Sequence, residues 1–478
     1  MPCDESWLFI LGMPRTITFS LFVLILVSEL VSGSPLVPEL FRERSKTLVF
    51  IEYYTQREID RQSGEGIGLV ISEGGLVVCL GNVFGDWVPP GKFKDIKVFA
   101  ASNPTGEGFP ATYLGQDWVT GWHYLKINDM EEAGNWLTSI TEFETGRPEI
   151  GEIVWGVCIT PGDLDYIPYY RDGKLSTIQP LPLDTGFATG EVAVPGGPVF
   201  LEDGRFAGWA GRSLPMERDI WVGQDYFRAN IRNPDESLMF ILAEPFFNEV
   251  FQRVPSDPLE HKRPWIGISG TQPLDKETAR FMGLTGQGVI IVSEVLEDTP
   301  ASRAGLEDRD LVIGINGETL PRLKPDSVVQ VYFERAILVS EIGEPLVLTV
   351  LRGEEELDIE IIPENSPVLM KEAKLKYFNE IGLTLREFIL GDALQRREDH
   401  RDLKGVVVNF IRPNSPAAAG DVQPSDWIQE IGGEPVAGFE EAVSRLEELS
   451  GNDLVEEIVL LVRRGTETAV LRIRKSAS

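Results

Sequence analysis

The sequence predicts a mainly β protein, in which a body of short strands precedes two copies of one smaller domain. Three observations support this fold class: short apolar runs separated by turn residues, no long helical periodicity before residue 244, and an internal repeat in the C-terminal half. At 478 residues and 42% hydrophobic content, the chain is long enough to bury several cores. Its length suggests about three domains.

The body is predicted over roughly residues 45–243, where apolar runs alternate with Gly, Pro and Asp. The runs read LVFIEYY, GIGLVIS, GLVVCLG, IVWGVCI and GGPVFL. Runs of this length, rich in β-branched and aromatic residues, are typical of strands in a barrel or sandwich. Helical periodicity appears only at residues 244–254, and the polar segment PSDPLEHKRP that follows is typical of a linker.

The C-terminal half contains one pattern twice. The segment GVIIVSEVLEDTPASRAGLEDRDLVIGINGETL begins at Gly288, and the similar segment GVVVNFIRPNSPAAAGDVQPSDWIQEIGGEPV begins at Gly405. Each copy is preceded by an apolar-Gly-apolar element, at residues 265–268 and 380–385, and is followed by a helical stretch and a strand ending in Arg-Gly. A repeat of this kind means two copies of one domain.

Composition excludes some classes of function. Asp and Glu outnumber Lys and Arg by 75 to 44, so the net charge is −31, and such a surface repels nucleic-acid phosphates. The apolar run at residues 17–27 predicts a secretory signal peptide over residues 1–33, with a retained anchor as the alternative. Only Cys79 and Cys158 would remain, too few for a disulfide scaffold or a four-thiolate metal site, and their pairing stays open. We expect no cofactor.

The repeated unit resembles the PDZ domain, in the arrangement of Deg/HtrA-type serine proteases. The segments TPASRAGLEDRDLVIGING and, less closely, SPAAAGDVQPSDWIQEIGG carry the resemblance. It implies a chymotrypsin-like double β-barrel at residues 45–254, a linker at 255–263, PDZ domain 1 at 264–363 and PDZ domain 2 at 378–475. It also implies a homo-oligomer, because family members commonly form trimers through the body.

In the body, three segments resemble the family regions that carry the catalytic His, Asp and Ser: GIGLVISEGGLVVCLGNVF, ATYLGQDWVTGWHYLKI and AVPGGPVFLEDGRFAG. The resemblance places Asn82, Gly121 and Pro195 at those positions. An amide is not a general base near neutral pH, Gly has no side chain, and Pro offers neither a nucleophile nor an N–H for an oxyanion. The sequence therefore predicts a protein that is not an enzyme, with no catalytic residue and no metal site. His123 is expected to be a half-buried strand histidine.

A PDZ domain binds a peptide that adds as a strand to a sheet edge, with the C-terminal carboxylate held by backbone amides. The resemblance assigns these amides to two apolar-Gly-apolar loops, in which Gly allows the backbone to turn. Simple core strands with a Gly bulge are the alternative. The predicted peptide-binding residues are Ile266, Gly267 and Ile268 in the first domain, and Ile381, Gly382 and Leu383 in the second.

Three hypotheses follow for the whole chain. The first is an exported, inactive Deg/HtrA-like protein that binds polypeptide segments or C-termini as a scaffold, adaptor or chaperone, either in the periplasm, at the envelope or secreted. The second is an active serine endopeptidase with an unorthodox catalytic site. The third is a structural envelope component whose grooves are closed or serve self-assembly.

Overall fold

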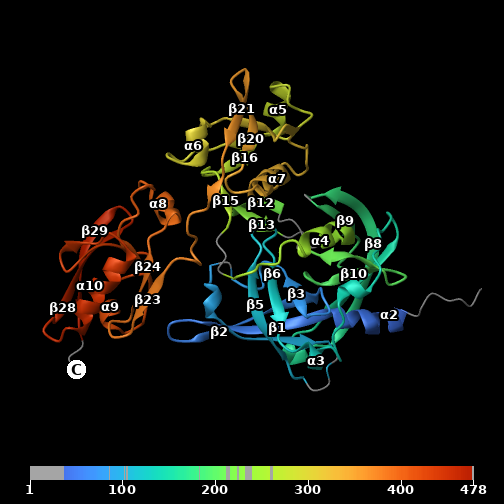
Figure 1. Ribbon diagram of the computed structural model, residues 1–478, viewed down its shortest axis with the longest axis horizontal. Helices are drawn as coiled ribbons and strands as arrows, with labels where there is room; N and C mark the ends of the chain where they lie inside the picture. The colour runs from blue at the N-terminus through green and yellow to red at the C-terminus, as the bar shows by residue number, and fades with distance from the viewer. Residues whose placement is uncertain are drawn as a thin grey trace, which may run out of the picture.

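The computed structural model describes residues 37–475, apart from residues 86, 102, 104–105, 182, 212–215, 223–224, 232–238 and 259–261. The predicted signal peptide lies outside these residues, as does part of the predicted linker. Three modules are visible in Figure 1: a two-barrel body, a first small domain above it and a second beside it. The mainly β fold with its two barrels is confirmed. Within the described residues, no helix combines the length and apolarity that a membrane crossing needs.

The body consists of two closed six-stranded barrels. A short helix, α2 (Val37–Arg44), precedes the first barrel. The first barrel follows the order β1 (Leu48–Gln56), β2 (Arg61–Val70), β3 (Leu76–Cys79), β6 (His123–Ile127), β5 (Phe109–Gln116) and β4 (Phe93–Ala100). The second follows β10 (Pro198–Leu201), β11 (Phe206–Ala210), β14 (Met239–Leu242), β9 (Asp184–Ala188), β8 (Pro168–Pro180) and β7 (Ile153–Ile159).

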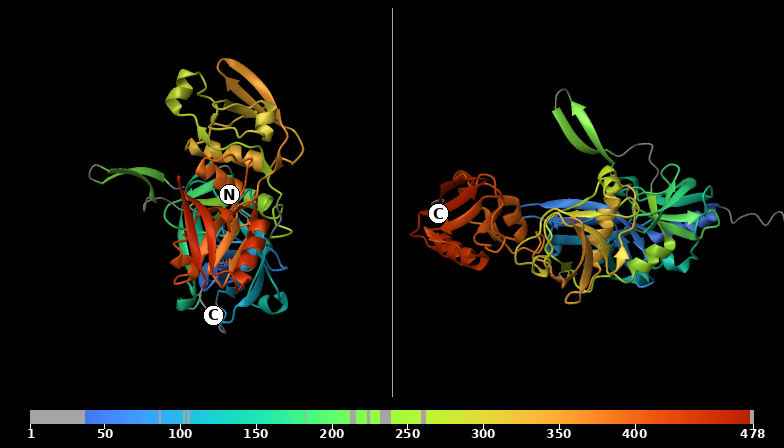
Figure 2. Two further views of the ribbon diagram at one scale, coloured as in Figure 1. Left: turned by 90° about the vertical axis from the view of Figure 1, so that its left-hand side faces the viewer. Right: turned by 90° about the horizontal axis from the view of Figure 1, so that it is seen from above.

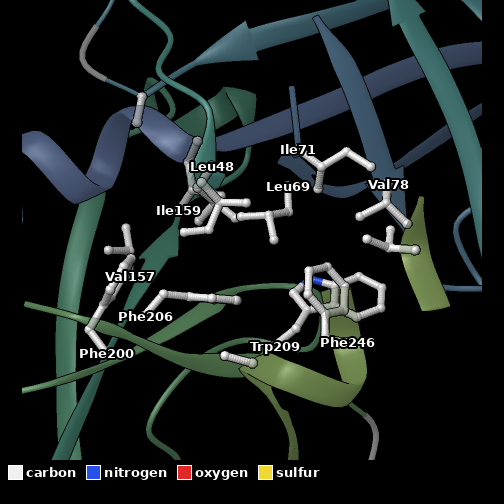
Figure 3. Close-up of a cluster of buried hydrophobic side chains, with 14 of the residues drawn as sticks. Leu48, Leu69, Ile71, Val78, Val157, Ile159, Phe200, Phe206, Trp209 and Phe246 are labelled. Carbon is white, nitrogen blue, oxygen red and sulfur yellow. The ribbon is translucent and has the colours of Figure 1, made fainter. Parts of the chain in front are cut away.

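The main core of the body lies where the two barrels meet (Figure 3). Leu69 and Val78 come from the first barrel, Phe206 and Trp209 from the second, and Phe246 from helix α4 (Ala243–Val250). All five side chains are fully buried. Burying one such apolar side chain stabilises the fold by about 1.5–3 kcal/mol, so this cluster fixes how the barrels sit against each other. A separate hairpin, β12 (Met216–Val222) and β13 (Asp225–Ile231), projects from the body in Figure 2.

The first small domain has a sheet in the order β16-β17-β18-β20-β21. A two-stranded pair, β15 with β22, joins the start of the domain to its end. Its strands are β15 (Pro264–Trp265), β16 (Thr271–Pro273), β17 (Ile290–Val292), β18 (Leu311–Ile315), β19 (Glu318–Thr319), β20 (Leu346–Arg352), β21 (Glu355–Ile361) and β22 (Glu364–Asn365). Its helices are α5 (Lys276–Phe281), α6 (Pro300–Ala304) and α7 (Ser327–Leu338).

The second small domain repeats this plan with one additional strand at the edge of its sheet. The sheet order is β23-β24-β25-β26-β28-β29. The strands are β23 (Leu375–Phe378), β24 (Leu383–Glu387), β25 (Val406–Ile411), β26 (Trp427–Ile431), β27 (Glu434–Pro435), β28 (Glu457–Arg464) and β29 (Glu467–Arg474). The helices are α8 (Leu390–Arg396), α9 (Pro416–Ala419) and α10 (Phe439–Gly451).

Charged side chains connect the three modules. Glu249 of α4 pairs with Arg335 of α7 at 2.6 Å, which ties the body to the first small domain. Lys371, between the small domains, lies with its Nζ 3.9 Å from the ring centre of Trp118 in the body. Arg401 of the second small domain pairs with Glu297 of the first at 2.7 Å.

Candidate functional site

The first candidate site is the loop at residues 266–268, called loop 1 below. Gly267 has φ +90°, and a Cβ at this position would lie 2.1 Å from the Cβ of Thr299, so only glycine fits. The carbonyls of Ile266 and Gly267 accept hydrogen bonds from Ala301 and Leu296 at 2.8 and 2.9 Å. Among the described residues, none accepts a hydrogen bond from the three amides of loop 1. Three neighbouring amides of this kind form an anion-binding nest.

The strand that follows loop 1 is the edge of its sheet. Strand β16 pairs only with β17 in the described sheet, in the register Thr271↔Val292 to Pro273↔Ile290. Helix α7 packs against β16 and forms the second wall of a groove that starts at loop 1. This helix is the helical stretch that follows the first copy of the sequence repeat. An edge strand with unpaired backbone groups is the structure to which a peptide strand adds.

The second candidate site is the corresponding loop at residues 381–383, called loop 2 below. Gly382 has φ +71°, and a Cβ here would lie 2.3 Å from the Cβ of Ser415. The carbonyls of Ile381 and Gly382 accept from Ala417 and Arg412 at 3.0 and 2.9 Å, in the same pattern as in loop 1. Loop 2 differs in two respects: the Gly382 amide donates to the Phe378 carbonyl at 2.8 Å, and Leu383 already belongs to β24, where it pairs with Phe378.

Each small domain anchors the turn behind its loop with the same ion pair, formed by a buried aspartate and a partly exposed arginine. Arg352 donates to the Asp310 carboxylate at 2.8 and 2.7 Å, and Arg464 donates to Asp426 at 2.7 and 2.9 Å. The hydrogen bonds that each arginine donates to its carboxylate raise the pKa of the arginine. The aspartate and the Arg-Gly pair are visible in both copies of the sequence repeat, but their pairing could not be read from the sequence. The pair fixes the turn that follows the short helix α6 or α9.

In the body, the three positions assigned to a catalytic triad lie on turns between strands. Asn82 is exposed on the turn after β3, and Gly121 (φ +74°) lies on the turn before β6. These turns touch, because a Cβ on Gly81 would lie 2.6 Å from the Gly121 carbonyl oxygen. Pro195 is half-buried on the turn before β10, and the next residue lies against β2.

His123 lies beneath the Asn82 turn and is only 1% exposed, so it is more deeply buried than the sequence suggested. The Tyr113 hydroxyl lies 2.7 Å from Nδ1, and Nε2 lies 3.1 Å from the Gly81 carbonyl. A carbonyl only accepts, so Nε2 carries the hydrogen and Nδ1 accepts from Tyr113. Both ring nitrogens therefore bond to groups that fix the turn.

The two cysteines of the described chain, Cys79 and Cys158, are free and buried. Burial raises the pKa of both thiols, which disfavours the reactive thiolate. No group of three or more His, Cys, Asp or Glu side chains in the described part of the chain is arranged to hold a metal ion.

The fold and the two loops define a class of protein: a chymotrypsin-like double barrel followed by two PDZ-type domains. The PDZ domain family model matches residues 258–334 and 383–463. The chain is 24% identical over 203 residues to a "Probable periplasmic serine endoprotease DegP-like" of Chlamydia pneumoniae, covering 42% of this chain and 38% of that protein. A protein of the same name from Brucella suis is 30% identical over 181 residues, covering 37% and 32%.

Two solved structures also resemble the chain. The HtrA-type protease AlgW with tripeptide has a TM-score of 0.48 at 18% identity, covering 70% of this chain and 99% of that one. The serine endoprotease from Yersinia pestis has a TM-score of 0.45 at 17% identity, covering 70% and 100%. The chain therefore contains two regions that match the PDZ domain family, and over about two fifths of its length it resembles DegP-like serine endoproteases. It spans about two fifths of the length of the curated relatives it matches.

The comparisons correct one prediction from the sequence. The chain was predicted not to be an enzyme, and this is contradicted because the matched relatives are named serine endoproteases. The prediction rested on three side-chain positions alone. A substitution at an assigned position removes one arrangement of catalytic groups, but it does not decide whether other polar groups in the same barrel fold serve the reaction.

Proposed function

We propose that the chain is an exported Deg/HtrA-type protein that binds polypeptide segments and protein C-termini through its two PDZ domains. The observation that carries this proposal is loop 1, where three consecutive amides around Gly267 have no acceptor among the described residues and lie beside an edge strand. A C-terminal carboxylate fits such amides, and the peptide before it can pair with β16. Export is supported by the relatives, which are named periplasmic.

The test is binding of a library of labelled C-terminal peptides to the full chain, measured by fluorescence anisotropy. We expect peptides with a free carboxylate to bind at least tenfold more tightly than the same peptides with an amidated end, because the nest recognises an anion. Gly267→Val should remove this preference, since any Cβ meets Thr299. Equal affinity for the two forms in every peptide would refute the proposal.

A second candidate function is peptide-bond hydrolysis by the barrel body, favoured by the names of the relatives. Asn82, Gly121 and Pro195 do not supply a Ser-His-Asp triad, so an unorthodox set of polar groups would have to act. Incubation with unfolded casein, followed by gel analysis, tests for cleavage. A fluorophosphonate probe tests for an activated serine, and loss of cleavage on substitution of one polar residue would identify the group. Intact casein and no labelling would leave peptide binding as the function. Identification of the bound proteins would then distinguish a scaffold, a chaperone and an envelope component.

A further inference from the structure

Strand β23 occupies the sheet edge of PDZ domain 2 that corresponds to the free edge of PDZ domain 1. It runs antiparallel to β24 in the register Leu375↔Arg386 to Phe378↔Leu383, while β25 pairs with the other side of β24. In PDZ domain 1 the corresponding strand, β16, has a partner on one side only in the described sheet. Strand β23 therefore lies where a peptide bound to a PDZ domain adds to the sheet.

Alternate side chains, starting at Lys374 just before β23, lie on the side of α10, the helix that forms the opposite wall of the groove. The Nζ of Lys374 lies 2.6 Å from Glu440, and the Nζ of Lys376 lies 2.5 Å from Glu447. Phe378, the next residue in this alternation, is 6% exposed and belongs to the same apolar cluster as two buried residues of α10, Ala442 and Leu446. Because successive side chains of a strand point to opposite faces, one face of β23 meets α10 at every second residue.

The end of β23 also contacts loop 2 as the end of a ligand would. The Phe378 carbonyl accepts from the Gly382 amide at 2.8 Å, one of the amides assigned to carboxylate binding. Arg412 donates to Asn379 at 2.9 Å, so its guanidinium lies at the mouth of loop 2, and it forms no ion pair within the described chain. A free carboxylate in place of the Phe378 carbonyl would add a second oxygen and a negative charge beside this arginine.

We propose that β23 is a tethered ligand in the groove of PDZ domain 2, and that external ligands of this groove share its chemistry. They are peptide C-termini that end in a large apolar residue, with Lys or Arg two and four residues before the end. The inference rests on the proposed function and specifies its ligand for one domain. An external peptide binds only when β23 leaves the groove.

The short connection between β23 and loop 2 determines how strongly β23 excludes external peptides from the groove. A segment held by a short connection has an effective concentration on the order of millimolar, so an external peptide with the same contacts competes poorly at micromolar concentration. The two ion pairs with α10 at the rim of the groove also hold β23 in place. The ion pair with Glu440 also raises the pKa of Lys374, which keeps the lysine charged. Reversing both lysine charges replaces attraction to α10 by repulsion and should release β23.

The experiment uses the full chain and a labelled peptide, KEAKLKYF, that copies residues 371–378 and ends in a free carboxylate. Lys374→Glu combined with Lys376→Glu should bind this peptide about tenfold more tightly than the natural chain. Lys404→Glu is the matched control, because Lys404 is 68% exposed and pairs with nearby Asp402. A second peptide with glutamate at both lysine positions should bind at least fivefold more weakly to the double variant.

Hydrogen exchange locates the bound peptide. In the natural chain, saturating peptide should increase amide exchange in residues 375–378, because the displaced strand loses its pairing with β24. Unchanged affinity in the double variant, or unchanged exchange in β23, would overturn the inference. If the library peptides still bind PDZ domain 1 and Gly267→Val abolishes that binding, the proposed function stands while this inference fails. If no peptide with a free carboxylate binds either domain, the proposed function itself fails.

Discussion

The two PDZ domains share a scaffold but differ in what precedes their carboxylate loops. Before loop 1, Pro264 and Trp265 pair with Asn365 and Glu364 of β22 and not with β16. Before loop 2, the corresponding part of the chain turns back along β24 and fills the groove. The same scaffold thus presents an open edge in one domain and a covered edge in the other, and the difference resides in a few residues outside the repeated core.

The residue types account for this difference. Pro264 has no N–H to donate to a sheet, which disfavours the preceding segment of loop 1 as a full ladder partner of β16. The guanidinium of Arg263 lies 5.4 Å from the ring centre of Trp118 in the body, which directs this segment toward the body instead. Residues 375–378 read Leu-Lys-Tyr-Phe and contain no proline, so every backbone N–H in this segment can donate to a sheet.

The largest expected effect concerns a buried ion pair of PDZ domain 2. Arg386 donates two hydrogen bonds to Asp392 at 2.8 and 2.6 Å, and each side chain is 5% exposed. Asp392→Ala leaves a buried guanidinium without its carboxylate, which costs about 3–5 kcal/mol. We expect the slowest amides of β24 and β25 to exchange at least a hundredfold faster, with those of PDZ domain 1 unchanged.

Exposed Asp399 provides the control for this change, since it is 49% exposed and pairs with Arg401 of its own segment. Asp399→Ala should leave the exchange rates of β24 unaltered. If Asp392→Ala changes those rates less than fivefold, the pair does not hold α8 against the sheet. In that case the Arg386–Asp392 pair does not distinguish the stability of PDZ domain 2 from that of PDZ domain 1.

The sequence was sufficient to predict the parts of the fold that depend on short, continuous stretches of residues. The repeat predicted two copies of one domain, and Gly267 and Gly382 marked the two tight loops, because each needs a backbone conformation that other residues disfavour. The assignment of ligand-binding roles to these loops stays a prediction. The predicted start of the second domain at residue 378 also stays a prediction, and β23 begins at residue 375.

Pairings between distant segments could not be predicted. The residue types at 375–378 permit a strand but do not identify its partner, because β24 and the free edge of any other sheet could pair with such a segment. The Lys376–Glu447 pair joins residues 71 positions apart, and no local signal relates them. The body shows the same limit: the sequence assigned Asn82, Gly121 and Pro195, but an assignment of positions did not establish what the barrel does.

Valine substitutions at Gly267 and Gly382 should distinguish an open groove from a covered one by their effect on peptide affinity. Gly267→Val and Gly382→Val introduce equivalent clashes, with Thr299 and Ser415 respectively. In the natural chain, Gly267→Val should weaken binding of carboxylate peptides more than tenfold. Gly382→Val should change it less than twofold, because β23 already covers the second groove. Titration by fluorescence anisotropy checks both values, with circular dichroism to confirm that the variants are folded.

The combination of Gly382→Val with the double lysine reversal sharpens this comparison. Any affinity that the reversal gains should be lost again when loop 2 is blocked, since both act on one groove. Equal losses from the two glycine variants in the natural chain would mean that both grooves are open, and the contrast between the domains would disappear.

The smallest expected effect concerns how PDZ domain 1 is held against the body. Burial alone would raise the pKa of Glu249, but hydrogen bonds from Arg253 and Arg335 outweigh it and hold the pKa below its usual value. Such a carboxyl stabilises the folded contact above its unfolded pKa, about 4.3, and this contribution is lost as the pH falls through the lower folded value. The side chains of Glu249 and Arg335 are 15% and 18% exposed, so the pair contributes about 1 kcal/mol.

Small-angle scattering between pH 6 and pH 3 should show PDZ domain 1 separating from the body. Glu249→Gln should show part of that separation already at pH 6, whereas Glu244→Gln, an exposed change on the same helix, should behave as the natural chain. An identical acid response in all three proteins would mean that other contacts, such as that of Arg263 with Trp118, hold this domain in place.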